Sequence, residues 1–339
     1  MKRVALFTLN SGGGGQWQYE SAVLAAVARL GSEPQLDLVR ARSLRSTADG
    51  EMRLPLRQAA SAPLGVQHVL TRAALRRFDL VHRCDLRLPS HPREVLTIHD
   101  TAWVHFVDAP TPAPASLRSV ASARAVLAPS RFAAAEIAEH LGRDDVIVAL
   151  NGVDARISTT PPAQGELLTR WGLNRPFVLC SGGNAARKNV ASLLAAWDRL
   201  GLHSHQLALT GTGVPIQSGS GVVRLGELSR PDYLAALAAA DLVVVPSTYE
   251  GFGLPAVEAM AAGIPVIASD RASLPEVCGD AALLVEPTAE GLAEGLAAGL
   301  HDDELRSTLV SRGRVHVAPF TWERSAQIHL ELYRLALSG

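Results

Sequence analysis

The sequence has few cysteines, no long apolar segment and almost no lysine. Its three cysteines, Cys84, Cys180 and Cys278, are far apart and form no CxxC pair or zinc-ligand spacing. This excludes a disulfide scaffold, predicts no metal site and favours a reducing compartment. No apolar run reaches the roughly 18 residues of a membrane span, and the run at 4–9 is too short for a signal-peptide core. We therefore expect a cytoplasmic protein without a membrane segment.

An excess of charge of one sign is missing as well. The 32 basic and 33 acidic residues give a formal net charge of −1. Binding to nucleic acid relies on a concentrated basic surface that displaces counterions, so nucleic acid is not an expected partner. Hydrophobic residues make up 47% of the 339 residues, which suits a soluble protein of two domains. Only Lys2 and Lys188 are lysines, a bias typical of a GC-rich bacterium.

Short apolar runs alternate with helical patterns along the chain. One series runs from 4–9 to 146–150, and a second runs from 177–180 to 283–285. Such alternation predicts parallel strands joined by crossover helices, hence an α/β protein with two similar sheets. The polar stretch 154–176 is predicted to be the interdomain linker, with one short helix at 166–171. We expect domains at 1–155 and 156–320, followed by a last helix at about 321–339.

The segment 250–258, Glu-Gly-Phe-Gly-Leu-Pro-Ala-Val-Glu, is the most informative. It follows an apolar strand, and the helix that it opens should end at Gly263. Free N–H groups at its start would direct the positive end of the helix dipole at an anion, with phosphate the natural candidate. Glu258, one turn into the helix, would accept hydrogen bonds from hydroxyls of the same ligand, with Glu250 on the other side. The alternative makes Glu250 a solvated loop carboxylate and Glu258 a dipole-compensating residue.

A glycine turn followed by two cations forms the second motif. Residues 181–189, Ser-Gly-Gly-Asn-Ala-Ala-Arg-Lys-Asn, leave the strand at 177–180 and precede a predicted helix at 190–200. Arg187 and Lys188 at a helix start oppose the helix dipole, and an anionic ligand would resolve this placement. The motif therefore predicts a diphosphate clamp. The alternative is a solvated basic helix start.

His99 and Asp100 form the third motif, at the end of the predicted strand 95–98. The carboxyl ends of parallel strands carry the functional loops of such sheets, and Asp100 is expected to orient the imidazole of His99. A purely structural pair is the alternative. Other histidines, including His82, His91 and His105, have no comparable context.

Four glycines at 12–15 follow the first strand and form the fourth motif. Gly12, Gly13 and Gly14 would let the backbone approach a ligand closely before a helix at 16–30. The dinucleotide spacing GxGxxG does not fit, because Trp17 and Gln18 follow, and the GK[ST] end of a P-loop is absent. A flexible loop is the alternative.

Together these motifs resemble the retaining glycosyltransferases of family 4, which have the GT-B fold of two Rossmann-like domains facing across a cleft. Glu250 and Glu258 match the E-x7-E motif of that family, and 182–189 match its diphosphate-binding turn. Residues 128–130 and 151–154 match its interdomain signatures. The resemblance is strongest from about residue 151 to residue 322 and thinner before it.

The resemblance implies roles for single residues. Arg187 and Lys188 would bind the nucleotide diphosphate, Glu258 the ribose hydroxyls and Glu250 the donor sugar, while His99 would face the transferred sugar. Many relatives carry an arginine where this chain has Gly183, and Arg187 would supply that charge. The last helix would cross back to the first domain. The remaining residues implied to line the donor site are Gly183, Glu227, Leu228, Gly251, Phe252, Gly253 and Leu254.

The implied activity is transfer of a hexosyl unit from a nucleotide diphosphate sugar, with UDP favoured and GDP next, to an acceptor hydroxyl. The anomeric configuration would be retained, and no metal or other cofactor is expected. The acceptor would be a sugar or natural product, as in antibiotic biosynthesis. Two alternatives stay open: a GT-B epimerase acting on nucleotide sugars, and a sugar-binding module without catalysis.

Overall fold

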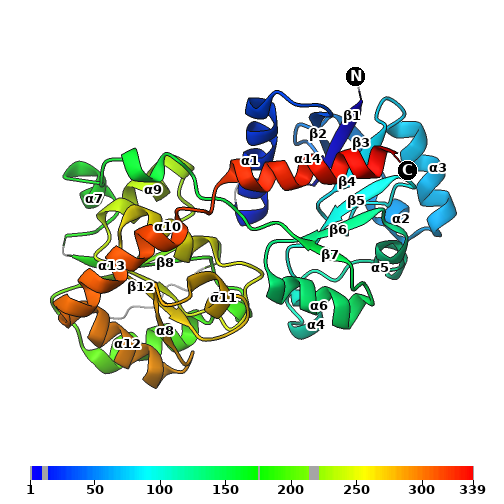
Figure 1. Ribbon diagram of the computed structural model, residues 1–339. Helices are drawn as coiled ribbons and strands as arrows, with labels where there is room; N and C mark the ends of the chain where they lie inside the picture. The colour runs from blue at the N-terminus through cyan, green and yellow to red at the C-terminus, as the bar shows by residue number, and fades with distance from the viewer. Residues whose placement is uncertain (1, 10–13, 175, 214–220, 339) are drawn as a thin grey trace. The chain divides into compact units, whose positions relative to one another are not determined.

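The computed structural model describes residues 2–9, 14–174, 176–213 and 221–338 (Figure 1). The chain forms two compact units. Unit 1 comprises Met1–Gly152 and Thr321–Gly339, and unit 2 comprises Val153–Phe320. The first and last residues of unit 2 are hydrogen-bonded to each other, because the Val153 N–H donates to the Phe320 carbonyl at 2.9 Å. The chain leaves unit 1 after Gly152, a few residues before the boundary predicted at 155/156.

Unit 1 is built on a seven-stranded sheet in the order β3-β2-β1-β4-β5-β6-β7 (Figure 1). Every recorded strand pair in it is parallel. Its central strands are buried on both faces, as parallel sheets require, which explains their continuous apolar runs. The strands are β1 (Arg3–Thr8), β2 (Gln35–Ser43), β3 (Met52–Leu54), β4 (Leu80–Arg83), β5 (Glu94–Thr97), β6 (Ala125–Ala128) and β7 (Val146–Val148).

The helices of unit 1 connect these strands, and the last helix of the chain joins them. That helix, α14, packs against α1 and β4 (Figure 1). It begins where Thr321 Oγ1 accepts from the Arg324 N–H at 3.2 Å and so caps the helix start. The helices are α1 (Gly14–Leu30), α2 (Leu56–Ser61), α3 (Leu64–Ala74), α4 (Ala102–His105), α5 (Pro114–Ser119), η1 (Val120–Ser122), α6 (Arg131–Leu141) and α14 (Trp322–Ser338).

Unit 2 has a six-stranded parallel sheet in the order β10-β9-β8-β11-β12-β13. The strands are β8 (Phe177–Ser181), β9 (Gln206–Thr210), β10 (Val222–Gly226), β11 (Leu242–Val245), β12 (Val266–Ser269) and β13 (Leu283–Val285). The helices are η2 (Ile157–Thr159), α7 (Glu166–Arg170), η3 (Ala186–Lys188), α8 (Val190–Leu200), α9 (Arg230–Ala239), α10 (Leu254–Ala262), α11 (Leu274–Cys278), α12 (Ala289–His301) and α13 (Asp303–Val317). The predicted α/β class with two parallel sheets is confirmed.

In unit 2 the strand order reverses between β8 and β11. Counted within the unit, the order is 3-2-1-4-5-6, the arrangement of dinucleotide-binding sheets. The carboxyl edge at β8 and β11 is therefore the switch point at which such sheets bind their ligands. The cation motif at 181–189 follows β8, and the glutamate motif at 250–258 follows β11.

The stretch 154–176 is not a free linker, which corrects the prediction. Ile157 and Ala163 are buried within unit 2, and the Ala163 N–H donates to the Ala235 carbonyl of α9 at 2.9 Å. These two buried apolar residues escaped prediction because prolines and polar residues surround them in the sequence. The predicted short helix is present as α7.

Among the residues that the structure describes, no helix combines the length and the hydropathy that crossing a bilayer requires.

Candidate functional site

The loop after β8 is shaped by close contact with the loop after β9. Gly183 has φ +75°, and a Cβ at this position would lie 2.7 Å from the Thr212 carbonyl oxygen. Only glycine fits such a left-handed, close-packed position. The Asn184 N–H donates to the same carbonyl at 3.0 Å. The turn is thus fixed by its neighbour, and it places η3, with its two cations, at the carboxyl edge of the sheet.

Arg187 and Lys188 converge on Glu250. Lys188 Nζ lies 2.6 Å from Glu250 Oε1, and Arg187 Nη1 lies 3.3 Å from Glu250 Oε2. Ser247 Oγ donates to Oε1 at 2.8 Å. Burial alone would raise the pKa of Glu250, but Lys188 and Arg187 outweigh it, and the pKa is lowered. The buried carboxylate of Glu250 is therefore ionised. The two cations that follow β8 thus form ion pairs with a glutamate that follows β11.

Helix α10 starts at the same edge of the sheet, after the buried residues Gly251, Phe252 and Gly253. Gly253 has φ +97°, and a Cβ there would lie 2.6 Å from Leu274 Cδ2. As a glycine, the N-cap residue Gly253 has no side chain that could cap this helix start. Pro255 has no N–H, and the Ala256 N–H donates to the Gly253 carbonyl at 3.0 Å, so the helix start presents the Leu254 N–H and the positive end of the dipole at the carboxyl edge of the sheet. The helix ends at Ala262, followed by Gly263 in the left-handed region, as predicted.

Glu258 is buried in α10 and pairs with a residue that sequence reasoning missed. Arg230 Nη2 lies 2.6 Å from Glu258 Oε1 and 3.3 Å from Asp154 Oδ2. The Arg230 guanidinium also lies 5.3 Å from the centre of the Tyr233 ring. Arg230 opens α9, directly after the β10 loop. Its position at the carboxyl edge was readable from the sequence, but its acidic partner lies 28 residues away.

Tyr233 links the two halves of this site. Its hydroxyl takes part in hydrogen bonds with Glu258 and with Ser181, the last residue of β8. Burial and the nearby Glu258 raise the pKa of Tyr233 well above its ordinary value, so the phenol stays protonated. The Tyr233 side chain therefore connects Glu258 with Ser181, the residue directly before the glycine turn that leads to Lys188. Glu227 and Leu228 follow β10 at the same sheet edge, with Glu227 exposed and Leu228 half-buried.

In unit 1, His99 follows β5 as predicted, but its environment differs from the prediction. Its ring lies edge-on to Tyr19, with centroids 4.6 Å apart, and burial lowers its pKa to about 4. Nε2 of His99 is buried without a hydrogen-bond partner among the described residues. Asp100 does not orient the imidazole through a hydrogen bond: its Oδ1 accepts from the Ala102 N–H at 3.1 Å, at the start of α4. The Asp100 carboxylate is therefore hydrogen-bonded within the turn that opens α4.

The glycine motif is described only in part. Gly12 and Gly13 lie outside the described residues. Gly14 is the first residue of α1, has φ +76° and is exposed.

A buried polar network of unit 1 was not predicted from the sequence. His329 Nε2 of α14 is hydrogen-bonded to Tyr19 Oη at 2.6 Å, and Tyr333 Oη is hydrogen-bonded to His82 Nδ1 at 2.6 Å. His82 and Tyr19 also reach the hydroxyl of Thr97 at 2.8 Å. Burial lowers the pKa of His82 well below its ordinary range and that of His329 to about 4. Neutral imidazoles thus help to hold α14 in unit 1.

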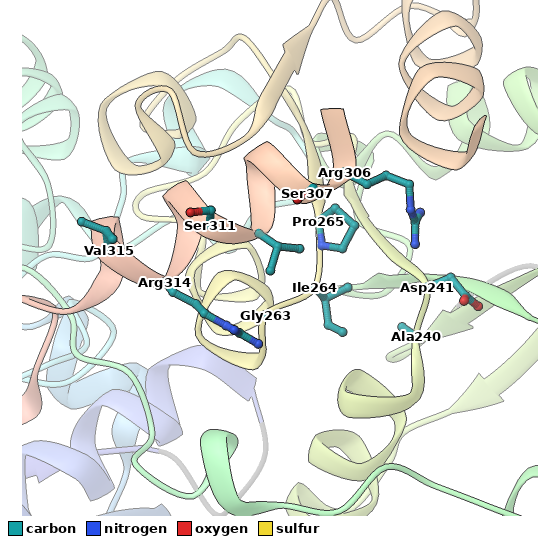
Figure 2. Close-up of a pocket in the computed structure, with 11 residues that line it drawn as sticks. Ala240, Asp241, Gly263, Ile264, Pro265, Arg306, Ser307, Ser311, Arg314 and Val315 are labelled. Atoms are coloured by element: carbon teal, nitrogen blue, oxygen red, sulfur yellow. The ribbon is translucent and has the colours of Figure 1, made fainter. Parts of the chain in front are cut away.

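A pocket of about 670 Å³ lies elsewhere on unit 2 (Figure 2). It is lined by α13 and by residues just before β11 and β12, including Asp241 and Pro265. Arg306 and Arg314 are also among the lining residues, and Arg306 donates to the Gly299 carbonyl at 2.7 Å. These strand starts form the amino edge of the sheet, opposite the glutamate and cation cluster. Its lining contains no predicted site residue, so we do not identify it with the candidate site.

Part of the chain is similar to known proteins. Residues 169–316 match the model of the glycosyl transferases group 1. The chain is 30% identical over 174 residues to an O-antigen chain mannosyltransferase B of Escherichia coli, covering 47% of this chain and 46% of that protein. It is 40% identical over 111 residues to a D-inositol 3-phosphate glycosyltransferase of Saccharomonospora viridis, covering 32% and 26%. The chain thus spans less than half the length of these curated relatives.

Solved structures resemble the whole chain. A sucrose-phosphate synthase from Thermosynechococcus elongatus has a TM-score of 0.78 at 23% identity, with both chains covered completely. HepE of Anabaena, in complex with UDP and glucose, has a TM-score of 0.75 at 18% identity, covering 99% of this chain and all of that one. At these identities the likeness shows the fold, which is the GT-B fold predicted from the motifs.

Proposed function

We propose that this chain, whose residues 169–316 match the model of the group 1 glycosyl transferases, moves a hexosyl unit from a nucleotide diphosphate sugar to an acceptor hydroxyl. The observation that carries the proposal is the meeting of Arg187, Lys188 and Glu250 with the uncapped start of α10 at the switch point of the unit 2 sheet. A diphosphate needs cations and N–H donors, and both converge here.

The donor that we favour carries UDP, with GDP next. Support comes from HepE, whose solved complexes contain UDP and UDP-glucose. We assign the base to the loop at Glu227 and Leu228. We assign the ribose hydroxyls to Glu258, because a buried carboxylate that is held by Arg230 can accept hydrogen bonds from vicinal hydroxyls.

The main chemical demand of the transfer is to stabilise the departing diphosphate. The bond between the anomeric carbon and the phosphate oxygen breaks, and Arg187, Lys188 and the Leu254 N–H at the positive end of α10 balance the growing negative charge. The acceptor oxygen bonds to the anomeric carbon on the same face, and its proton passes to the departing phosphate. Retention then follows without a covalent enzyme intermediate or a catalytic metal.

Glu250 has a positioning role in this scheme. Its carboxylate holds Lys188 and Arg187 in place, and its backbone carbonyl accepts from Ser273 Oγ at 2.8 Å. With the backbone of Gly251–Leu254 we assign it to the donor sugar. We assign His99 of unit 1 to contact the transferred sugar as a neutral imidazole, since its pKa is about 4.

We place the reaction in the cytoplasm, because the three cysteines are free and buried. The acceptor class that we favour is a sugar or natural product, as in the biosynthesis of an oligosaccharide antibiotic. The composition typical of a GC-rich bacterium supports this choice.

The proposal is tested by incubating the protein with UDP- and GDP-sugars, with and without a panel of sugar alcohols and glycosides. We expect release of the nucleoside diphosphate that depends on the added hydroxyl, and NMR of the product should show the anomeric configuration of the donor. Donor conversion without an acceptor would indicate the epimerase instead. Binding without any turnover would indicate a sugar-binding module, and an inverted linkage would reject the retaining mechanism.

A further inference from the structure

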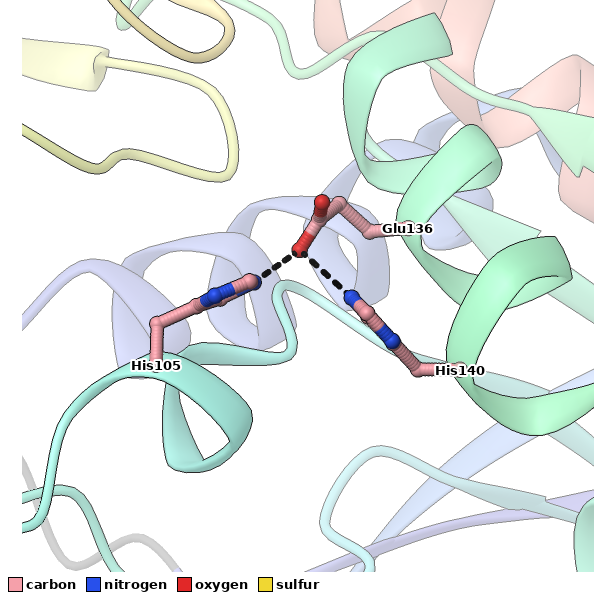
Figure 3. Close-up of side chains that lie close together, drawn as sticks. All are labelled: His105, Glu136 and His140. Atoms are coloured by element: carbon pink, nitrogen blue, oxygen red, sulfur yellow. Dashed lines mark hydrogen bonds and ion pairs between the residues drawn. The ribbon is translucent and has the colours of Figure 1, made fainter.

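Three side chains of unit 1 that the transfer reaction does not use point toward one another at α4 and α6 (Figure 3). They are His105, the last residue of α4, and Glu136 and His140 of α6. One ligand atom from each of the three lies within 4.8 Å of the other two. Glu136 and His140 are four residues apart on one helix, so their side chains share a face.

The distances centre on one carboxylate oxygen. His105 Nε2 lies 2.6 Å from Glu136 Oε2, and His140 Nε2 lies 3.7 Å from the same oxygen. Thr101 Oγ1 donates to the same oxygen at 2.8 Å, which helps to fix the carboxylate. The two imidazole rings lie 5.3 Å apart between centroids. Two ring nitrogens and one carboxylate oxygen therefore surround a small common volume.

Internal hydrogen bonding does not account for the whole cluster. Nε2 of His140 is buried and has no hydrogen-bond partner among the described residues, since its distance to Glu136 is too long for one. A buried ring nitrogen is costly when left unsatisfied. The side chain nevertheless points at the carboxylate rather than at solvent (Figure 3).

We propose that His105, Glu136 and His140 bind a divalent transition-metal ion, with Zn²⁺ the first candidate. Two imidazoles and one carboxylate form a donor set that zinc accepts, leaving a fourth position for water or another ligand. Tetrahedral zinc with bonds of about 2.0–2.1 Å separates its ligand atoms by about 3.3 Å, between the two distances observed here. The ion would satisfy His140 and tie α4 to α6. Thr101 would act as a positioning residue for the carboxylate.

This inference does not depend on the proposed transferase activity, and its test uses none. The full-length, untagged chain is stripped with a chelator and titrated with Zn²⁺ by calorimetry, with metal content measured after gel filtration. We expect one Zn²⁺ per chain, a rise in the unfolding temperature and, with Co²⁺, the visible absorption of a four-coordinate ion. His105→Gln and His140→Gln should each weaken binding at least about tenfold.

Glu136→Gln separates a metal site from a hydrogen-bonded cluster. Glutamine still accepts from Thr101 but lacks the anionic oxygen, so metal affinity should fall while folding persists. His301→Gln is the matched control, because His301 is an exposed histidine at the end of α12 in unit 2. The proposal is overturned if the wild-type chain binds no Zn²⁺ or Co²⁺, or if His105→Gln binds them as the wild type does.

Discussion

The Nζ atom of Lys188 lies 2.6 Å from Oε1 of Glu250, a carboxylate that Arg187 also contacts. Two positive charges and one negative charge leave the cluster with one positive charge. Because Glu250 is 6% exposed, this charge acts in a poorly screened environment. The ion pair with Glu250 therefore holds the Lys188 side chain in place. The remaining positive charge of the cluster can still attract a phosphate.

Replacing Lys188 by alanine should lower kcat/KM for the donor by about 10²-fold or more, the usual effect of removing one preorganised charge-stabilising group. Lys188→Arg keeps the charge and should retain more activity. Steady-state kinetics with a UDP-sugar measures both. If Lys188→Ala turned over donor like the wild type, Lys188 would not contact the diphosphate.

Glu258→Gln should raise the donor KM about tenfold or more while changing kcat less, because hydrogen bonds from the ribose to a charged carboxylate are made in both the ground state and the transition state. Glu290→Gln, at a 70% exposed side chain of α12, is the control and should leave KM unchanged. Unfolding curves for both variants show whether loss of the Arg230 contact destabilises the fold. A fall in kcat with constant KM would contradict the ribose role.

The strands were predictable because both sheets bury their central strands on two faces, which leaves runs such as 242–245 continuously apolar. Strand β3 escaped prediction, because its three residues are half-buried or exposed and show no such run. Arg230 and the cluster of His105, Glu136 and His140 escaped for another reason. Arg230 is 28 residues from Glu258 in the sequence, and His105 is 31 residues from Glu136, so only the fold brings these partners together.

Stability should fall as the pH decreases from 6.5 toward 4. The pKa of His329 is lowered from 6.5 to about 4 by burial, so in this window the unfolded chain binds a proton that the folded chain does not. Above pH 6.5 both states are neutral, and the contribution is complete. The shift corresponds to about 3 kcal/mol for His329.

Urea unfolding at pH 7 and pH 5 measures this dependence. His329→Gln should show a smaller loss of stability between the two pH values than the wild type, although His82 and His99 keep part of the loss. The exposed-site variant His301→Gln should keep the full loss. An unchanged loss in His329→Gln would show that His329 is not buried as a neutral group.

Gly253→Ala should destabilise the protein more than Gly142→Ala. Both glycines have positive φ, which costs a residue with a Cβ about 1–2 kcal/mol. At Gly142 a Cβ meets nothing within 4 Å, whereas at Gly253 it would lie 2.6 Å from Leu274 Cδ2. Overpacking adds about 1–3 kcal/mol at the second site. Equal free energies of unfolding for the two variants would mean that the start of α10 is less tightly packed.

Calorimetric binding of UDP and uridine to the wild type and to Lys188→Ala tests the diphosphate site most directly. The account predicts that the wild type binds UDP at least about tenfold more tightly than uridine, and that Lys188→Ala loses most of this advantage without losing its affinity for uridine. Equal affinity of both proteins for UDP would contradict it.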